Sequence, residues 1–118
     1  MAKVLIVDDA KFSRLMLGNI IKQEGHEIFE ASDGKECLTE YDKVKPDLVT
    51  LDITMPNMDG LEALKHLIKS HPDAKVVMVS AMGQQCFVID AIKTGAKDFL
   101  VKPFTQERVK ETLIKFLT

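Results

Sequence analysis

The chain alternates short aliphatic runs with longer amphipathic stretches over its whole length. The first, third, fourth and fifth runs are almost continuously aliphatic, which is typical of strands buried on both faces of a parallel sheet. The segments that we expect to form strands are Lys3–Val7, Glu27–Ala31, Leu48–Leu51, Lys75–Val79 and Phe99–Val101.

Each expected strand is followed by a stretch in which apolar residues recur at helical spacing. The second stretch, about Lys35 to Val44, has the weakest apolar stripe, but Asp33 and Glu36 resemble a capping box at its start. The core-facing residues expected in the other four are Phe12, Leu15, Met16 and Ile20; Leu61, Leu64, Leu67 and Ile68; Val88, Ile89 and Ile92; and Val109, Leu113, Phe116 and Leu117. This alternation predicts an α/β fold of the (βα)5 type, a doubly wound, five-stranded parallel sheet with helices on both faces.

Length and composition fit one globular unit. A chain of 118 residues is long enough for one compact domain, and we expect residues 1–118 to form it. Hydrophobic residues make up 46% and charged residues 29% of the chain, which argues against intrinsic disorder.

Charge and hydropathy argue against nucleic acid and membranes as partners. The 16 basic and 18 acidic residues are spread along the chain and give a net charge of −2, so no basic footprint for nucleic acid is present. No apolar run approaches the ~20 residues of a membrane-spanning helix, and the N-terminus does not resemble a signal peptide. We therefore expect a cytoplasmic protein that binds neither nucleic acid nor membrane.

Polar groups follow four of the five expected strands directly. Asp8 and Asp9 follow the first strand, Asp52 the third, Ser80 the fourth and Lys102 the fifth. Doubly wound sheets bind ligands beyond the carboxyl ends of their strands. Each residue alone is commonly a turn former, but their joint occurrence predicts that three carboxylates and one ammonium converge.

Such a cluster suggests metal-assisted phosphoryl chemistry. Three adjacent carboxylates repel one another, and a hard divalent cation relieves that repulsion. Since no His or Cys lies in these loops, the donors favour Mg²⁺, or Mn²⁺, over zinc. Asp52, on the expected central strand, can attack phosphorus as a nucleophile. The metal and Lys102 would neutralise the phosphoryl oxygens, and the Ser80 hydroxyl can donate a hydrogen bond to one of them.

At these residues the sequence resembles the response regulator receiver family. The resemblance covers essentially the whole chain, is greatest to the stand-alone chemotaxis receivers, and implies a flavodoxin-like strand order 2-1-3-4-5. The matching segments are LIVDD (Leu5–Asp9), DLVTLDITMPNMDG (Asp47–Gly60), VVMVSAMG (Val76–Gly83) and GAKDFLVKPF (Gly95–Phe104).

The resemblance implies that Asp52 is the phosphoacceptor and that a sensor histidine kinase is the phosphodonor. The metal ligands would be Asp9, Asp52 and the backbone carbonyl of Thr54, with Asp8 acting through water. Lys102 would pair with the phosphoryl group. The protein would then be a monomeric signalling switch with intrinsic acyl-phosphate hydrolysis, not a turnover enzyme.

Further residues acquire expected roles from the same resemblance. Ser80 and Phe99 would be the switch residues, and Phe99 stands where enteric chemotaxis receivers have Tyr. Thr54 and Met82 would flank the path of the hydrolytic water. The downstream partner would be a flagellar switch component or another effector protein, and a phosphatase is a further partner to consider.

We also expect a cis peptide bond between Lys102 and Pro103. The Lys102 side chain must turn back into the site while the chain leaves for the last helix. An X-Pro bond adopts the cis form at a cost of only ~0.5–1 kcal/mol.

Other functions share parts of the pattern. A phosphohydrolase could use Asp52-Ile53-Thr54 as a DxDxT loop, but the second Asp, the general acid and base, is missing. A flavodoxin-like cofactor binder would need a first loop that cradles phosphate, whereas Asp8-Asp9 repel it. Within the receiver family, a phosphorelay intermediate and a receiver cut from a DNA-binding regulator both stay open.

Overall fold

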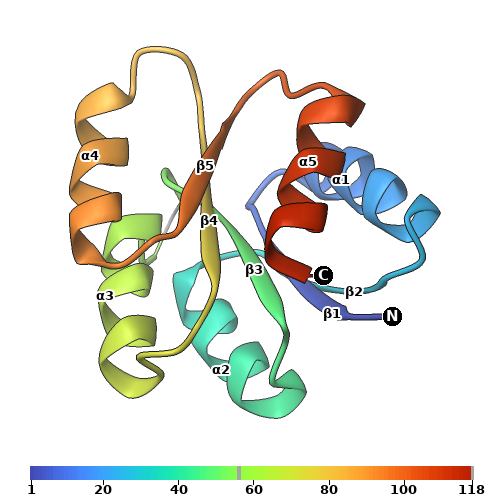
Figure 1. The fold of residues 1–118 in the computed structure, drawn as a ribbon. Helices are drawn as coiled ribbons and strands as arrows, with labels where there is room; N and C mark the ends of the chain where they lie inside the picture. Colours follow the sequence, from blue (N-terminus) through green and yellow to red (C-terminus); the bar gives the residue numbers. More distant parts are fainter. Residues whose placement is uncertain (56, 118) are drawn as a thin grey trace.

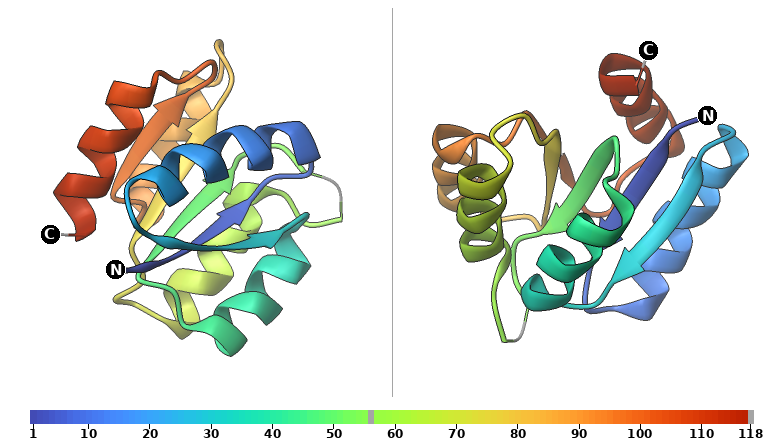
Figure 2. Two further views of the ribbon diagram at one scale, coloured as in Figure 1. Left: turned by 90° about the vertical axis from the view of Figure 1, so that its right-hand side faces the viewer. Right: turned by 90° about the horizontal axis from the view of Figure 1, so that it is seen from below.

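The computed structural model describes residues 1–55 and 57–117 and shows a five-stranded parallel sheet between two layers of helices (Figures 1 and 2). The strand order is β2-β1-β3-β4-β5, as expected. The elements are β1 (Lys3–Val7), α1 (Lys11–Gln23), β2 (Glu27–Ala31), α2 (Gly34–Val44), β3 (Leu48–Asp52), α3 (Gly60–Ser70), β4 (Val76–Ser80), α4 (Gln85–Thr94), β5 (Asp98–Val101) and α5 (Gln106–Leu117).

Two hydrophobic clusters hold the helices on the sheet. Alternate residues of a strand point to opposite faces, so Val4 and Ile6 of β1 pack with α1 and α5, whereas Leu5 and Val7 pack with α2, α3 and α4. Figure 2 shows the same division, with α1 and α5 on one side of the sheet and the other three helices on the opposite side.

The same alternation sorts the polar residues at the strand ends. Asp8, Asp52 and Lys102 continue the series of their strands that faces α1 and α5, because Ile6, Leu48 and Leu100 belong to that cluster. Ser80 belongs to the opposite series, since Val76 and Met78 face α2, α3 and α4. Phe99, next to Leu100, likewise lies in the series on the α4 side.

Three strands differ by one residue at one or both ends from the prediction. The ladder between β3 and β4 pairs Asp52 with Val79, and the ladder between β4 and β5 pairs Ser80 with Val101. Asp52 and Ser80 are therefore the last residues of β3 and β4, and not the first residues of the following loops. β5 begins at Asp98, which pairs with Val77.

The predicted core face of α1 is largely wrong. Phe12, Leu15 and Met16 are exposed, and the helix buries Leu17, Gly18 and Ile21 instead. The buried stripe is displaced because Gly18 brings the helix close to β2, where a Cβ at Gly18 would lie 2.9 Å from Ile28 Cδ1. In α4 the stripe is displaced as well: Val88 and Ala91 are buried, whereas Ile89 and Ile92 are exposed.

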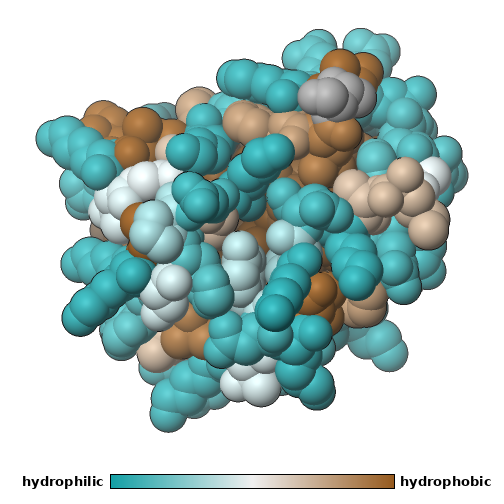
Figure 3. Space-filling view, turned by 60° about the horizontal axis from the view of Figure 1, so that its bottom comes forward, coloured by the Kyte–Doolittle hydropathy of each residue, from teal (hydrophilic) through white to brown (hydrophobic). Residues whose placement is uncertain are grey.

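Side-chain oxygens cap the starts of α2, α3 and α5, where the Thr105 hydroxyl accepts a hydrogen bond from the Arg108 backbone amide at 3.1 Å. The Asp33 carboxylate accepts a hydrogen bond from the Glu36 amide at 2.8 Å, in agreement with the predicted cap, and Asp59 accepts one from the Glu62 amide at 2.9 Å. The face brought forward in Figure 3, at the lower end of the view in Figure 1, is covered mainly by hydrophilic residues. None of the helices in residues 1–55 and 57–117 is both long and apolar enough to cross a membrane.

Candidate metal centre

Three carboxylates meet beyond the carboxyl ends of β1 and β3. One ligand oxygen from each of Asp8, Asp9 and Asp52 lies within 4.8 Å of the others, and Asp8 and Asp52 are buried while Asp9 is exposed. This is the crevice at which the strand order reverses, where the fold is expected to bind ligands. The predicted convergence of the three acids is present in the structure.

Three hydrogen bonds fix the position of Asp8. Its amide donates to the Ala31 carbonyl at 3.1 Å, and its Oδ1 accepts from the Ala10 amide at 2.9 Å. Arg14 of α1 donates to the Asp8 carbonyl at 2.6 Å. The residue is therefore held by β2, by the start of α1 and by a cationic side chain.

Lys102 reaches two of the three acids. Its Nζ lies 2.8 Å from Asp8 Oδ2 and 3.6 Å from Asp52 Oδ2. Its amide donates to the Ser80 carbonyl at 2.7 Å, which ties the end of β5 to the end of β4. The Lys102–Pro103 peptide bond is cis, the isomer expected from the sequence.

The cluster changes the acidity of its members. Burial and, after it, the negative charges of Asp8 and Asp9 raise the pKa of Asp52 to about 6, although the nearby Lys102 ammonium acts to lower it. Burial alone would lower the pKa of Lys102, but its hydrogen bond to Asp8 and the attraction of Asp52 and Asp8 raise it overall. The site therefore carries more negative charge than one ammonium can balance.

The donor set fits a hard divalent cation. It consists of three carboxylates with oxygen atoms close enough to share one ion, and Mg²⁺ binds proteins through one or two carboxylates while keeping several waters. A cation would also offset the repulsion by Asp8 and Asp9 that contributes to the raised pKa of Asp52. The residues present are thus those that such an ion requires.

The other predicted site residues lie on β4, on β5 and in the loops that follow β3 and β4. Ser80 is buried at the end of β4 and lines a cavity of about 520 Å³ together with Phe99 of β5, whose side chain is partly exposed. Met82 lies in the following loop and is 80% exposed. Thr54 follows β3, and its hydroxyl accepts a hydrogen bond from Nε2 of the Gln84 side chain at 2.9 Å.

Two residues of the site were missed by the sequence reasoning. A Cβ at Gly60 would collide with the backbone carbonyl of Asp52, so only glycine lets α3 start so close to the phosphoacceptor candidate. The Asp59-Gly60 pair could have indicated this position from the sequence, because Asp is a favoured N-cap residue and Gly60 follows it directly. Gln84 contacts both Ala81 and Thr54, and no sequence pattern indicated it.

Comparison with known proteins identifies the family. The model of the response regulator receiver domain matches residues 4–114. The chain belongs to the response regulator receiver family. Receiver domains of this kind generally bind Mg²⁺, which agrees with the acidic cluster.

Chemotaxis receivers are among the similar proteins. This receiver is 60% identical over 116 residues to the chemotaxis protein CheY of Listeria monocytogenes, covering 98% of each chain. It is 55% identical to CheY of Thermotoga maritima, covering 96% of this chain and 95% of the relative. Among solved structures, the CheX-CheY-BeF3-Mg²⁺ complex from Borrelia burgdorferi matches with a TM-score of 0.91 and 39% identity, covering 98% of this chain and 90% of that chain.

Proposed function

We propose that this receiver is a chemotaxis response regulator that is switched on when Asp52 accepts a phosphoryl group from a phosphohistidine of a sensor kinase. One observation carries the proposal. Asp52 ends the central strand, its carboxylate lies within 4.8 Å of two other carboxylates, and Lys102 approaches it at 3.6 Å. Phosphoryl transfer to aspartate needs a carboxylate nucleophile, a site for a divalent cation and a positioned ammonium group.

In the transfer step, an Asp52 carboxylate oxygen forms a bond to phosphorus while the bond between phosphorus and the donor imidazole nitrogen breaks. The bonding electron pair leaves with the imidazole. Lys102 neutralises part of the charge on the phosphoryl oxygens, and the Ser80 hydroxyl donates to one of them. Hydrolysis switches the protein off: water attacks phosphorus, the bond between phosphorus and the Asp52 oxygen breaks, and inorganic phosphate and the Asp52 carboxylate are released.

Asp8, Asp9 and Asp52 would hold the divalent cation, with the Thr54 carbonyl as a further ligand. When bound, Mg²⁺ supplies positive charge to the oxygens of the phosphoryl group. Thr54 follows β3 and Met82 lies in the loop after β4, and both residues are exposed. We assign them an influence on the access of the hydrolytic water, and hence on the lifetime of the phosphorylated state.

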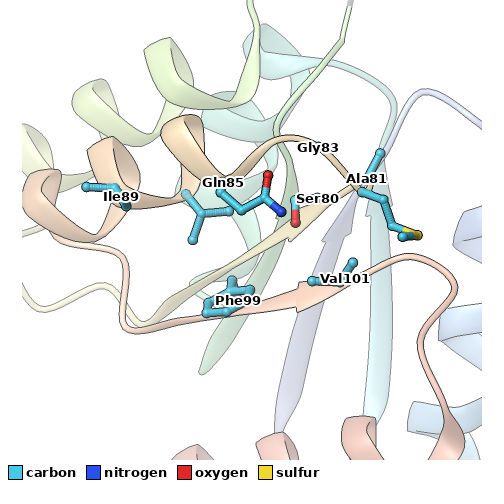
Figure 4. Close-up of a pocket in the computed structure, with 9 residues that line it drawn as sticks. Ser80, Ala81, Gly83, Gln85, Ile89, Phe99 and Val101 are labelled. Atoms are coloured by element: carbon cyan, nitrogen blue, oxygen red, sulfur yellow. The ribbon is translucent and has the colours of Figure 1, made fainter.

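The cavity behind Ser80 offers a route to a protein partner. Figure 4 shows Ser80 at the end of β4, Ile89 on α4 and Phe99 on β5 around this cavity. If the Ser80 hydroxyl moves toward a phosphoryl oxygen, it vacates space beside the cavity, and the partly exposed Phe99 ring can rotate inward. The surface formed by α4, β5 and α5 then changes without unfolding, and a flagellar switch component can read the change.

Chemotaxis is better supported than the phosphorelay function that the sequence also leaves open. The sporulation initiation phosphotransferase F of Bacillus subtilis, named for phosphotransfer, is 33% identical over 115 residues. The chemotaxis proteins quoted above are 55% and 60% identical. We therefore propose a flagellar switch partner, with a phosphatase as a second one.

Acetyl phosphate with Mg²⁺ tests the chemistry. Intact-mass spectrometry should detect one added phosphoryl group that is stable in acid and labile to hydroxylamine. EDTA and the Asp52→Asn substitution should each abolish it. Asp90→Asn, which removes an exposed carboxylate from α4, is the matched control and should label like the parent. Equal labelling of Asp52→Asn would refute the assignment.

The readout is tested separately with beryllofluoride and Mg²⁺. Amide resonances of α4 and of Phe99 should shift along with those around Asp9, Asp52 and Lys102. Ser80→Ala should still label but should transmit smaller shifts to α4. Shifts confined to the loops around the acids would refute the proposed route.

A further inference from the structure

Gln84 joins the two loops that border the phosphoacceptor candidate. Its Oε1 accepts a hydrogen bond from the Ala81 amide at 2.7 Å, and its Nε2 donates to the Thr54 hydroxyl at 2.9 Å. Ala81 follows β4, whereas Thr54 follows β3, so one side chain spans the ends of the two strands. Both ends of its amide group are used.

Helix capping does not explain this side chain. Gln84 is the N-cap residue of α4, yet its side chain makes no capping hydrogen bond to the helix. Gln is also not among the residues favoured at N-caps, which are Ser, Thr, Asp and Asn. The side chain turns back to Ala81, and the intervening Gly83, with a φ of +89°, permits the tight loop that brings it there.

The Ala81 amide is a donor that a phosphoryl group on Asp52 would need. Asp52 pairs with Val79 in the ladder between β3 and β4. Because Asp52 is the last residue of β3, a group attached beyond its carboxylate is expected beside the residues that follow Val79, namely Ser80 and Ala81. A phosphoryl group presents three acceptor oxygens, and Lys102 and a cation do not exhaust them.

We propose that Gln84 is an autoinhibitory clamp, which holds the Ala81 amide away from the phosphoryl site and ties it to Thr54 in the unphosphorylated state. The clamp rests on the proposed function of Asp52. When a phosphoryl group arrives, the Ala81 amide exchanges the Gln84 oxygen for a phosphoryl oxygen. The bond from Gln84 to Thr54 is then freed as well, so the exposed loop from Ala81 to Gly83 can close over the site.

The contact itself is tested without any ligand. Amide hydrogen exchange of the metal-free protein, measured by NMR, should show protection at Ala81 that Gln84→Ala removes. Gln106→Ala is the matched control, because it deletes a side-chain hydrogen bond of the same kind, to Gln23, far along the chain. Loss of Ala81 protection in Gln84→Ala and not in Gln106→Ala supports the clamp. Unchanged protection in Gln84→Ala overturns it.

Competition with the phosphoryl group is tested by titrating beryllofluoride in the presence of Mg²⁺. Gln84→Ala should bind it roughly two- to twelve-fold tighter than the parent, the range that one net hydrogen bond gives. Gln106→Ala should bind it like the parent. In the Thr54→Val background, where one end of the clamp is already gone, Gln84→Ala should have a smaller effect, and this non-additivity would not arise from a general loss of stability.

The outcomes separate the clamp from the proposed function. No beryllofluoride binding by the parent would overturn the function assigned to Asp52. Binding by the parent, with equal or weaker binding by Gln84→Ala, would overturn the clamp alone and make Gln84 a support of the active loop. Fully additive effects of Gln84→Ala and Thr54→Val would show that the two residues do not act through their shared hydrogen bond.

Discussion

Replacing the phosphoacceptor candidate by its neutral isostere should stabilise the protein. Asp52 is buried among Asp8 and Asp9, and its pKa rises from the ordinary 3.8 to about 6. Each unit of pKa corresponds to about 1.4 kcal/mol, so ionised Asp52 lowers the free energy of unfolding by about 3 kcal/mol. Asp52→Asn in EDTA at pH 7.5 should recover most of that amount, which is on the order of 10 °C in Tm for a chain of this size.

The stability gained by Asp52→Asn should depend on pH in one direction. The folded state binds the Asp52 proton more tightly than the unfolded state, so the contribution of this residue to stability falls as pH rises from about 4 to above 6. Asn resembles the protonated acid at every pH. The difference in stability between Asp52→Asn and the parent should therefore be largest above pH 7 and should shrink toward zero near pH 4.

Urea denaturation in EDTA, followed by circular dichroism from pH 4 to pH 8, measures this difference. Asp90→Asn, which removes an exposed carboxylate from α4, should change stability little at any pH. A parent as stable as Asp52→Asn at pH 7.5, or a difference that does not depend on pH, would show that repulsion and burial do not destabilise the ionised site.

Other predictions follow from the same structure. Millimolar Mg²⁺ should raise the Tm of the parent more than that of Asp9→Ala in differential scanning fluorimetry, because an ion that binds the native state alone stabilises it; equal shifts would exclude Asp9 from the cation site. Leu64→Ala should lower the free energy of unfolding by about 2–5 kcal/mol in urea titrations, since the side chain is fully buried. A thiol reagent should label exposed Cys86 in the native protein and reach Cys37 only in denaturant, because burial raises the Cys37 pKa to about 12.

The sequence predicted the sheet and the acid cluster well because both follow from regular patterns. Continuous aliphatic runs identify buried parallel strands, and residues that directly follow such strands must share one edge of the sheet. Asp8, Asp9, Asp52 and Lys102 could therefore be placed together with no coordinates. The strand order came from the family resemblance and not from the periodicity itself.

The helix faces were harder to predict because periodicity does not fix rotation when a helix carries apolar residues on two sides. In α1 the exposed Phe12 and Leu15 are as hydrophobic as the buried Leu17 and Ile21. The close approach at Gly18 decides between them, and that approach is a tertiary contact. Gln84 was missed for a related reason, since its two partners are 3 and 30 residues away along the chain.

The polar residues at the strand ends are divided between the two faces of the sheet, and this division affects which substitutions a receiver domain can accept during evolution. Asp8, Asp52 and Lys102 belong to the face covered by α1 and α5, whereas Ser80 and Phe99 belong to the face covered by α4. If a partner binds the α4 side, as we propose, substitutions there can alter partner choice while leaving the carboxylate cluster intact. Communication between the two faces has to pass around the carboxyl end of β4, so the few residues there set how strongly chemistry and recognition are coupled.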